Sequence, residues 1–150
     1  MNGKCLCSAV EFQLDEPIPS LYQCHCSLCR KLTGSASDTA MLISRDQFRW
    51  VRGLDKISSY RTNTGYRSDF CSSCGCTVPH LMSKTLYFWV PAGLIDGELH
   101  SQVVAHLYVD SKAPWDTIDE TGARFAEMPE MEALTRLLHE NSEKIESDLV

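Results

Sequence analysis

Cysteine spacing constrains this chain more than any other feature of its sequence. The 150 residues include eight cysteines, and these fall into three short clusters. The clusters are Cys5-Leu6-Cys7, Cys24-His25-Cys26-Ser27-Leu28-Cys29 and Cys71-Ser72-Ser73-Cys74-Gly75-Cys76. Sulfurs separated by one or two residues come close enough to share an ion, and thiolates suit tetrahedral zinc. The clusters therefore predict metal binding.

The first and third clusters each offer one closely spaced pair of ligands. Cys5 and Cys7 form one pair, and Cys71 and Cys74 form the other. Because four thiolates close a structural zinc site, we expect these pairs to clip the first strand to the middle of the sheet. Gly75 follows Cys74 directly and suits the tight turn that such a knuckle needs.

The middle cluster has three cysteines and no obvious fourth ligand. Cys24, Cys26 and Cys29 lie within six residues, at an expected junction between a strand and a helix. Three sulfurs can hold one zinc and leave a position open, which is typical of catalytic zinc. A helix N-terminus, with Arg30 and Lys31 nearby, would favour thiolate over thiol.

Other arrangements of the eight cysteines stay open at this point. Four disulfides are one alternative, and two closed structural sites are another, with Cys76 or His25 as the fourth ligand of the second. Met1–Cys5 has no apolar segment of the kind found in signal peptides, so we expect a cytoplasmic protein, where thiols stay reduced. We expect Cys76 to be a small buried thiol and His25 to point away from the metal.

The charge of the chain is unevenly distributed. Residues 1–110 hold ten Lys+Arg and ten Asp+Glu, whereas residues 111–150 hold four and ten, which accounts for the whole net charge of −6. A neutral body with an acidic tail offers no basic stripe for nucleic acid, so none is expected as a partner. No apolar run approaches the length of a membrane span, so no membrane partner is expected either.

Alternating apolar residues predict a mainly β body. The expected strands, which are bounded by Asp, Gly, Asn and Pro turn signals, are Val10–Leu14, Leu21–Cys24, Thr39–Ser44, Phe48–Arg52, Ile57–Arg61, Tyr66–Cys71, Thr77–Leu81, Leu86–Pro91 and Val103–Val109. His80 and His106 fall on these strands.

Two helical segments are expected. Ser27–Gly34 reads as one or two turns, with Ser27 as the N-cap and Gly34 as the terminator. Pro129–Asn141 reads as one clear helix, whose apolar stripe is Met131, Leu134, Leu137 and Leu138. Without repeats or a low-complexity linker, we expect one zinc-binding domain over residues 1–150, with a core at about 3–115 and an acidic helical tail at about 116–150.

In this combination the motifs resemble those of the glutathione-dependent formaldehyde-activating enzyme family, which includes centromere protein V. The matching elements are Gly3-x-Cys5-x-Cys7, Cys24-His25-Cys26-Ser27-x-Cys29-Arg30-Lys31, Gly34-Ser35, Phe70-Cys71-x-x-Cys74-Gly75 and Lys112-Ala113-Pro114-Trp115. They cover roughly residues 3–115. Cys76 and the acidic tail have no counterpart in the family pattern.

The resemblance implies a fold, two metal sites and an activity. The fold is a β-tent of coiled antiparallel sheets, related to zinc ribbons. The implied ligands are Cys5, Cys7, Cys71 and Cys74 for a structural zinc, and Cys24, Cys26 and Cys29 for a second, labile and catalytic zinc. Family members are described as carbon–sulfur lyases that join glutathione and formaldehyde into S-hydroxymethylglutathione.

The predicted function is therefore a zinc-dependent carbon–sulfur lyase that acts on a small, glutathione-like thiol and a small aldehyde. The alternative is a non-catalytic, zinc-stabilised module that binds a protein or a small ligand. A fourth protein ligand on the Cys24, Cys26 and Cys29 metal would favour the module, and water or an added thiol would favour the enzyme.

Overall fold

The computed structural model describes the backbone of residues 1–148 and the side chains of residues 1–140. The chain forms two compact units. The first unit comprises Met1–Pro17 and Leu42–Leu99, and the second comprises Ile18–Met41 and the chain from His100 onward. Strand β4 (Asp38–Ser44) runs from the second unit into the first.

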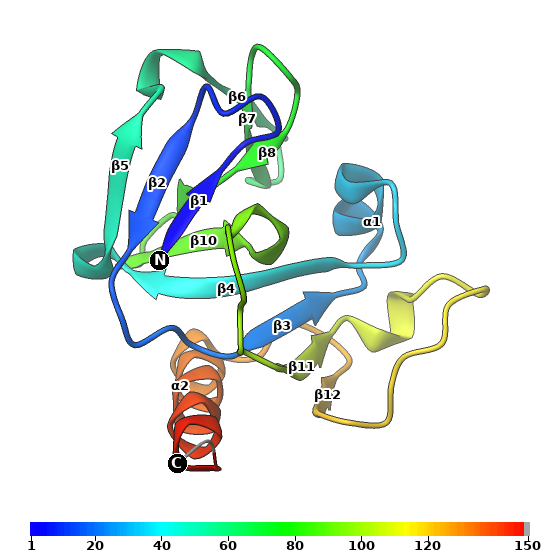
Figure 1. The fold of residues 1–150 in the computed structure, drawn as a ribbon. Helices are drawn as coiled ribbons and strands as arrows, with labels where there is room; N and C mark the ends of the chain where they lie inside the picture. The colour runs from blue at the N-terminus through cyan, green and yellow to red at the C-terminus, as the bar shows by residue number, and fades with distance from the viewer. Residues whose placement is uncertain (149–150) are drawn as a thin grey trace. The chain divides into compact units, whose positions relative to one another are not determined.

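Antiparallel strands make up most of the first unit (Figure 1). One sheet has the order β1-β2-β5, another has the order β6-β7-β8, and β10 pairs with β9. The strands are β1 (Asn2–Lys4), β2 (Glu11–Leu14), β5 (Phe48–Arg52), β6 (Ile57–Arg61), β7 (Arg67–Cys71), β8 (Thr77–Val78), β9 (His80–Leu81) and β10 (Tyr87–Pro91). Single 3-10 turns occupy Arg45–Gln47, Leu54–Lys56 and Ala92–Leu94.

Strand β2 shows how the sequence pattern produces the core of this unit. Phe12 and Leu14 are buried, whereas Glu11 and Gln13 between them are only half-buried, as expected for a period of two. Phe12 stacks on Phe48 with ring centroids 5.5 Å apart, and Phe48 stacks on Phe88 at 3.9 Å. These rings pack β2, β5 and β10 together, and β2 pairs with β1, which leads into the loop that carries Cys5 and Cys7.

The second unit mixes parallel and antiparallel pairs. Strand β3 (Leu21–Cys24) pairs antiparallel with β4 and parallel with β11 (Val103–Leu107), and β11 also pairs parallel with β12 (Ala123–Phe125). Helix α1 (Ser27–Thr33) follows β3 after two residues, and a 3-10 turn at Val109–Ser111 follows β11. The end of β3, the start of α1 and the end of β11 are thereby brought together.

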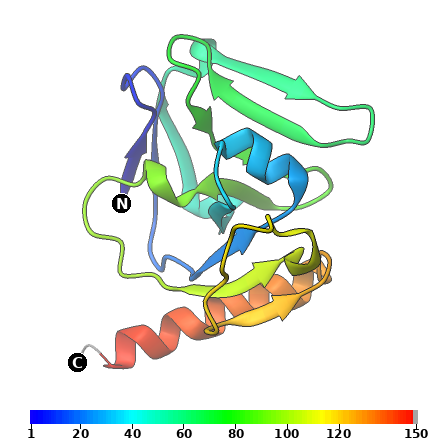
Figure 2. The ribbon, with the colours of Figure 1, turned by 90° about the vertical axis from the view of Figure 1, so that its right-hand side faces the viewer.

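The C-terminal helix α2 (Met131–Asp148) lies along β11 and β12 (Figure 2). Leu134 and Leu138 are fully buried, and the backbone N–H of Ser20 donates to the carbonyl of Leu138 at 3.0 Å. The apolar stripe thus packs on its own unit. The helix begins two residues after Pro129 and continues past Asn141, so the predicted bounds were too early at both ends.

The sequence prediction of a mainly β fold with short helices and one C-terminal helix is confirmed. The three sheets are mostly antiparallel, with the parallel pairs of β11 as the exception. Two strands of three residues each, β1 and β12, were not predicted. The helices within residues 1–148 include none that combines the length and the apolar character needed to span a membrane.

Candidate metal centres

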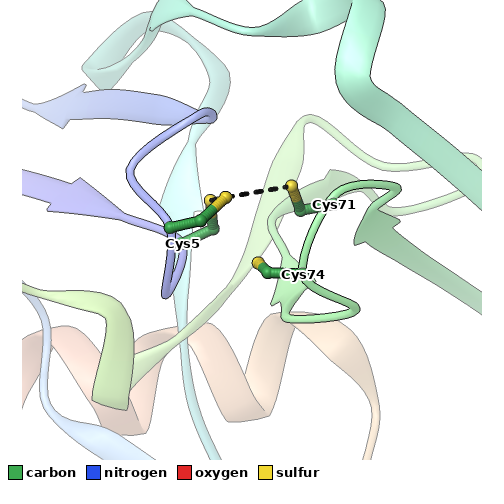
Figure 3. A group of neighbouring side chains, drawn as sticks. Cys5, Cys71 and Cys74 are labelled. Carbon is green, nitrogen blue, oxygen red and sulfur yellow. Dashed lines mark hydrogen bonds between the residues drawn. The ribbon is translucent and has the colours of Figure 1, made fainter.

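Four cysteines of the first unit converge from two loops (Figure 3). Cys5 and Cys7 lie in the turn between β1 and β2, whereas Cys71 ends β7 and Cys74 lies in the turn before β8. The two loops come from the ends of separate sheets. The cysteines that they bring together are more than 60 residues apart in the sequence. A positive φ of 74° at Gly75 provides the turn after Cys74.

The spacing of these sulfurs fits a tetrahedral metal ion. Cys5 Sγ lies 3.7 Å from Cys7 Sγ, and Cys7 Sγ lies 3.8 Å from Cys71 Sγ. Zinc–sulfur bonds of about 2.3 Å in a tetrahedron place neighbouring sulfurs about 3.8 Å apart. The sulfurs of all four cysteines lie within 4.8 Å of one another. Cys5 Sγ also accepts a hydrogen bond from the N–H of Val10 at 3.3 Å.

The pKa values of these thiols are shifted by neighbouring backbone N–H groups and by one another. The backbone N–H of Cys76 contributes most to lowering the pKa of Cys74, to about 6. The Ala9 N–H lowers the pKa of Cys7, but hydrogen bonding to Cys74 and burial outweigh it and raise that pKa to about 11. Neighbouring thiols cannot all ionise without a compensating charge, and a bound cation supplies one.

Three cysteines of the second unit form the other group. Cys24 is the last residue of β3, Cys26 is the residue before α1, and Cys29 lies in the first turn of that helix. Their sulfurs lie within 4.8 Å of one another, and no further His, Cys, Asp or Glu of the described residues joins the group. The helix starts where Cys26 Sγ accepts a hydrogen bond from the N–H of Cys29 at 3.4 Å. Cys26 and not Ser27 is therefore the N-cap.

The thiols of this group interact strongly with one another. Hydrogen bonding from Cys29 is the main cause that lowers the pKa of Cys24, to about 7, against the opposing effect of burial. The same hydrogen bond, reinforced by burial, raises the pKa of Cys29. A group of close sulfurs in which one thiol ionises easily is suited to binding a cation, because the thiolate is the form that ligates a metal.

Sequence reasoning missed a carboxylate beside this group. Asp38 lies directly opposite Cys24 in the antiparallel β3–β4 pair, so the two side chains share one face of the sheet. Asp38 is only 6% exposed, and burial raises its pKa to about 6. Its negative charge contributes to raising the pKa of Cys29, after the hydrogen bond from Cys24 and burial. Only the strand register reveals this neighbour.

His25 precedes Cys26, and Arg30 follows Cys29. Both make polar contacts that fix the loop, and neither belongs to the three-cysteine group. His25 points away from the three sulfurs, because its Nε2 lies 3.2 Å from His106 Nδ1. Arg30 donates from Nε to the carbonyl of His25 and from Nη2 to the carbonyl of Ser111. The Arg30 guanidinium therefore joins α1 to the turn after β11, whereas Lys31 is exposed.

Cys76 is a member of neither group, although it lies next to the four-cysteine group. It packs against the buried cluster of Cys5, Val10, Cys71 and Val78, and it is only half-buried. Its thiol donates weakly to the carbonyl of Thr77 at 3.5 Å. All eight cysteines are free thiols, so the arrangement with four disulfides is absent from this structure.

A four-thiol knuckle and a separate three-thiol group on a mainly β scaffold define a class of proteins whose two cysteine clusters are consistent with two metal sites. Within this class, the model of the family described as "Glutathione-dependent formaldehyde-activating enzyme" matches residues 1–111. The chain belongs to this family. The match includes all eight cysteines and ends before Trp115.

Individual relatives agree with this assignment. A Halomonas elongata protein named "Putative glutathione-dependent formaldehyde-activating enzyme" is 29% identical over an alignment of 134 residues, with 79% of this chain and 81% of that protein covered. A crystal structure of a Rhodobacter sphaeroides protein superposes with a TM-score of 0.55 and 25% identity, covering 66% of this chain and 91% of the other. The chain is similar to both over most of their lengths.

Proposed function

We propose that this protein is a zinc-dependent carbon–sulfur lyase that forms or breaks an adduct between a small thiol and a small aldehyde, such as S-hydroxymethylglutathione. Family membership supports the class of reaction. The observation that carries the proposal is the group of three thiols at the end of β3, which lacks a fourth ligand among the described residues. Catalytic zinc sites typically have three protein ligands and one open position.

Each cysteine group has its own role in this proposal. Cys5, Cys7, Cys71 and Cys74 hold a structural zinc that ties the β1–β2 turn to the β7–β8 turn. Cys24, Cys26 and Cys29 hold the catalytic zinc. A zinc ion bound there supplies Lewis acidity, which polarises a carbonyl or lowers the pKa of a thiol.

The reaction itself forms one bond and moves one proton. The substrate sulfur bonds to the carbonyl carbon of the aldehyde, and the proton of the thiol passes to the former carbonyl oxygen, which becomes a hydroxyl. The buried carboxyl of Asp38 lies on the same face as Cys24 and can accept a hydrogen bond from the thiol or the hydroxyl. The exposed ammonium of Lys31 is available to attract the carboxylates of glutathione, whereas Arg30 is bound to backbone carbonyls.

Turnover of glutathione with a panel of aldehydes, measured with and without added zinc, tests the proposal. The wild-type protein should form the adduct, and Cys26→Ser should not. Cys76→Ser is the matched control, because Cys76 belongs to neither group, and it should retain activity. A wild-type protein that holds two zinc ions but turns over no aldehyde would instead support a non-catalytic, zinc-stabilised module.

A further inference from the structure

A buried chain of polar contacts links the three-cysteine loop to the segment that follows β11. Asp116 Oδ2 lies 3.4 Å from His25 Nδ1, and His25 Nε2 lies 3.2 Å from His106 Nδ1. At the far end, His106 Nε2 lies 3.2 Å from the carbonyl oxygen of Thr121. Both imidazole rings are only 2% exposed. All four residues belong to the second unit.

The carbonyl of Thr121 fixes the direction of these hydrogen bonds. A carbonyl oxygen only accepts, so His106 Nε2 carries a proton and donates it. Burial is the main cause that lowers the pKa of His106, which favours the neutral ring with Nδ1 as an acceptor. His25 Nε2 must then donate to His106 Nδ1. His25 Nδ1 consequently faces the Asp116 carboxylate, whose Oδ2 lies within ion-pair distance at 3.4 Å.

The contact between His25 and Asp116 has no substitute nearby. Among the described residues, neither His25 Nδ1 nor Asp116 Oδ2 makes a hydrogen bond, and both atoms are shielded from solvent, so the 3.4 Å contact between them is the polar contact that each side chain has at this point. Leaving such a buried group without any polar partner is destabilising. Loss of the Asp116 carboxylate would therefore leave the outer nitrogen of His25 without a partner.

His25 is held by its backbone as well as by its ring. Its N–H donates to the carbonyl of Leu107 at 2.9 Å, and its carbonyl accepts from Arg30 Nε at 3.3 Å. Cys24 and Cys26 are its two covalent neighbours. A fixed ring and two fixed peptide groups at His25 therefore set how the sulfurs of Cys24 and Cys26 stand relative to each other.

We propose that Asp116, His25 and His106 form a positioning unit that presets the sulfurs of Cys24 and Cys26 for one metal ion. The inference rests on the proposed function only in treating the three-cysteine group as a metal site. Asp116 and Thr121 lie beyond residues 1–111, the part matched by the family model. The C-terminal segment of this chain thus contributes to a metal site whose ligands all lie near its N-terminus.

Cobalt(II) binding in the presence of a competing chelator tests this inference. Absorption by thiolate-bound cobalt should show two steps, and Cys26→Ser should remove the step that belongs to the three-cysteine group. Residues that orient metal ligands typically change affinity by about 10–100-fold. Asp116→Ala should therefore weaken that step at least about tenfold, while the four-cysteine step stays close to wild type.

A conservative variant and a control separate positioning from general damage. In Asp116→Asn the amide N–H can donate to His25 Nδ1, so that nitrogen keeps a polar partner and the cobalt affinity should stay within about threefold of wild type. Glu120→Gln removes an exposed carboxylate from the same segment and should change neither step. If Asp116→Ala does not fold, Asp116→Leu takes its place, because its similar bulk lacks a hydrogen-bonding group.

Two results would overturn the inference. One is wild-type affinity at the three-cysteine step in Asp116→Ala or Asp116→Leu, and the other is equal weakening by Asp116→Asn and the variants without a hydrogen-bonding group. The proposed lyase activity fails separately, if wild-type protein with both sites loaded turns over no aldehyde. Weaker cobalt binding in Asp116→Ala, together with no turnover by the wild-type protein, would therefore support the positioning unit and reject the lyase.

Discussion

The backbone N–H of Cys29 donates to Cys26 Sγ at 3.4 Å, so that one thiol both caps helix α1 and belongs to the three-cysteine group. A side-chain acceptor at this position satisfies an N–H that the helix leaves free. Serine is a better N-cap than alanine, but its hydroxyl is a poor substitute for a thiolate at zinc. Substitutions of Cys26 can therefore separate the cap from the metal ligand.

We expect Cys26→Ser to keep the fold and lose the metal of the three-cysteine group. With zinc retained only on the other four cysteines, Cys26→Ser should unfold at nearly the wild-type denaturant midpoint. Under the same conditions Cys26→Ala should lose about 1 kcal/mol, the usual contribution of an N-cap. Denaturant unfolding and zinc content measured on the same samples check both statements. Cooperative folding lost in Cys26→Ser would show that this group is structural.

Asp38 should restrain the reactivity of the neighbouring thiols when the metal is absent. Its carboxylate opposes ionisation of both thiols, although other effects are larger: the hydrogen bond from Cys29 lowers the pKa of Cys24, and the same hydrogen bond together with burial raises the pKa of Cys29. Asp38→Asn removes that charge, so alkylation of the metal-free group by iodoacetamide at pH 8 should become faster. Asp46→Asn, an exposed acid of the first unit, is the control. Unchanged or slower alkylation in Asp38→Asn would contradict this prediction.

The four-cysteine group should be essential for folding. Cys71 is completely buried, and the spacing of its sulfur from that of Cys7 fits a shared tetrahedral ion. Because the binding energy of a structural zinc is folding energy, Cys71→Ala should abolish cooperative unfolding or make the protein insoluble. Cys76→Ala, which removes a thiol outside the group, should stay folded. Circular dichroism during thermal unfolding distinguishes these outcomes, and a Cys71→Ala protein of wild-type stability would refute the prediction.

Local patterns in the sequence were sufficient for much of the fold. The strands Phe48–Arg52 and Ile57–Arg61 have the predicted bounds, because each combines β-forming residues with clear turn signals. Cysteine pairs likewise indicated which thiols would converge, since close spacing constrains their sulfurs directly. Strands β1 and β12 were missed because three residues are too few to show a period of two.

Tertiary neighbours were beyond the reach of the sequence. Asp38 lies opposite Cys24 only because of the β3–β4 register, and Asp116 contacts His25 across about 90 residues of chain. Neither aspartate belongs to a recognisable motif. The N-cap prediction failed for a related reason, because propensity favoured Ser27, whereas the structure uses Cys26, whose sulfur lies in the three-cysteine group.

Helix α2 should contribute substantially to the stability of the second unit. Leu134 is fully buried in its apolar stripe. Leu134→Ala should therefore cost about 2–5 kcal/mol in the free energy of unfolding. Arg136→Ala, on the exposed side of the same helix, should change it by less than about 0.5 kcal/mol. Urea unfolding of both variants checks this, and equal stabilities would mean that α2 does not pack on its unit in solution.

His80 should make the protein sensitive to mild acid. Burial is the main cause that lowers its pKa to about 4, against the opposing attraction of Asp69. Its Nδ1 is buried without a hydrogen-bond partner in the described chain, and its ring lies 5.0 Å from that of Trp89. Unfolded chains take up the proton near pH 6.5. The contribution of neutral His80 to the free energy of unfolding is therefore fully present above about pH 6.5, and it is lost as the pH falls toward 4.

The variant His80→Gln isolates this effect from the protonation of metal-binding thiolates, which both proteins share. Between pH 7 and pH 5, wild-type protein should lose about 2 kcal/mol more unfolding free energy than His80→Gln. Urea unfolding at several pH values, with zinc in constant excess, measures the difference. Parallel pH profiles for the two proteins would show that His80 titrates alike in the folded and unfolded states, and that its burial imposes no acid sensitivity.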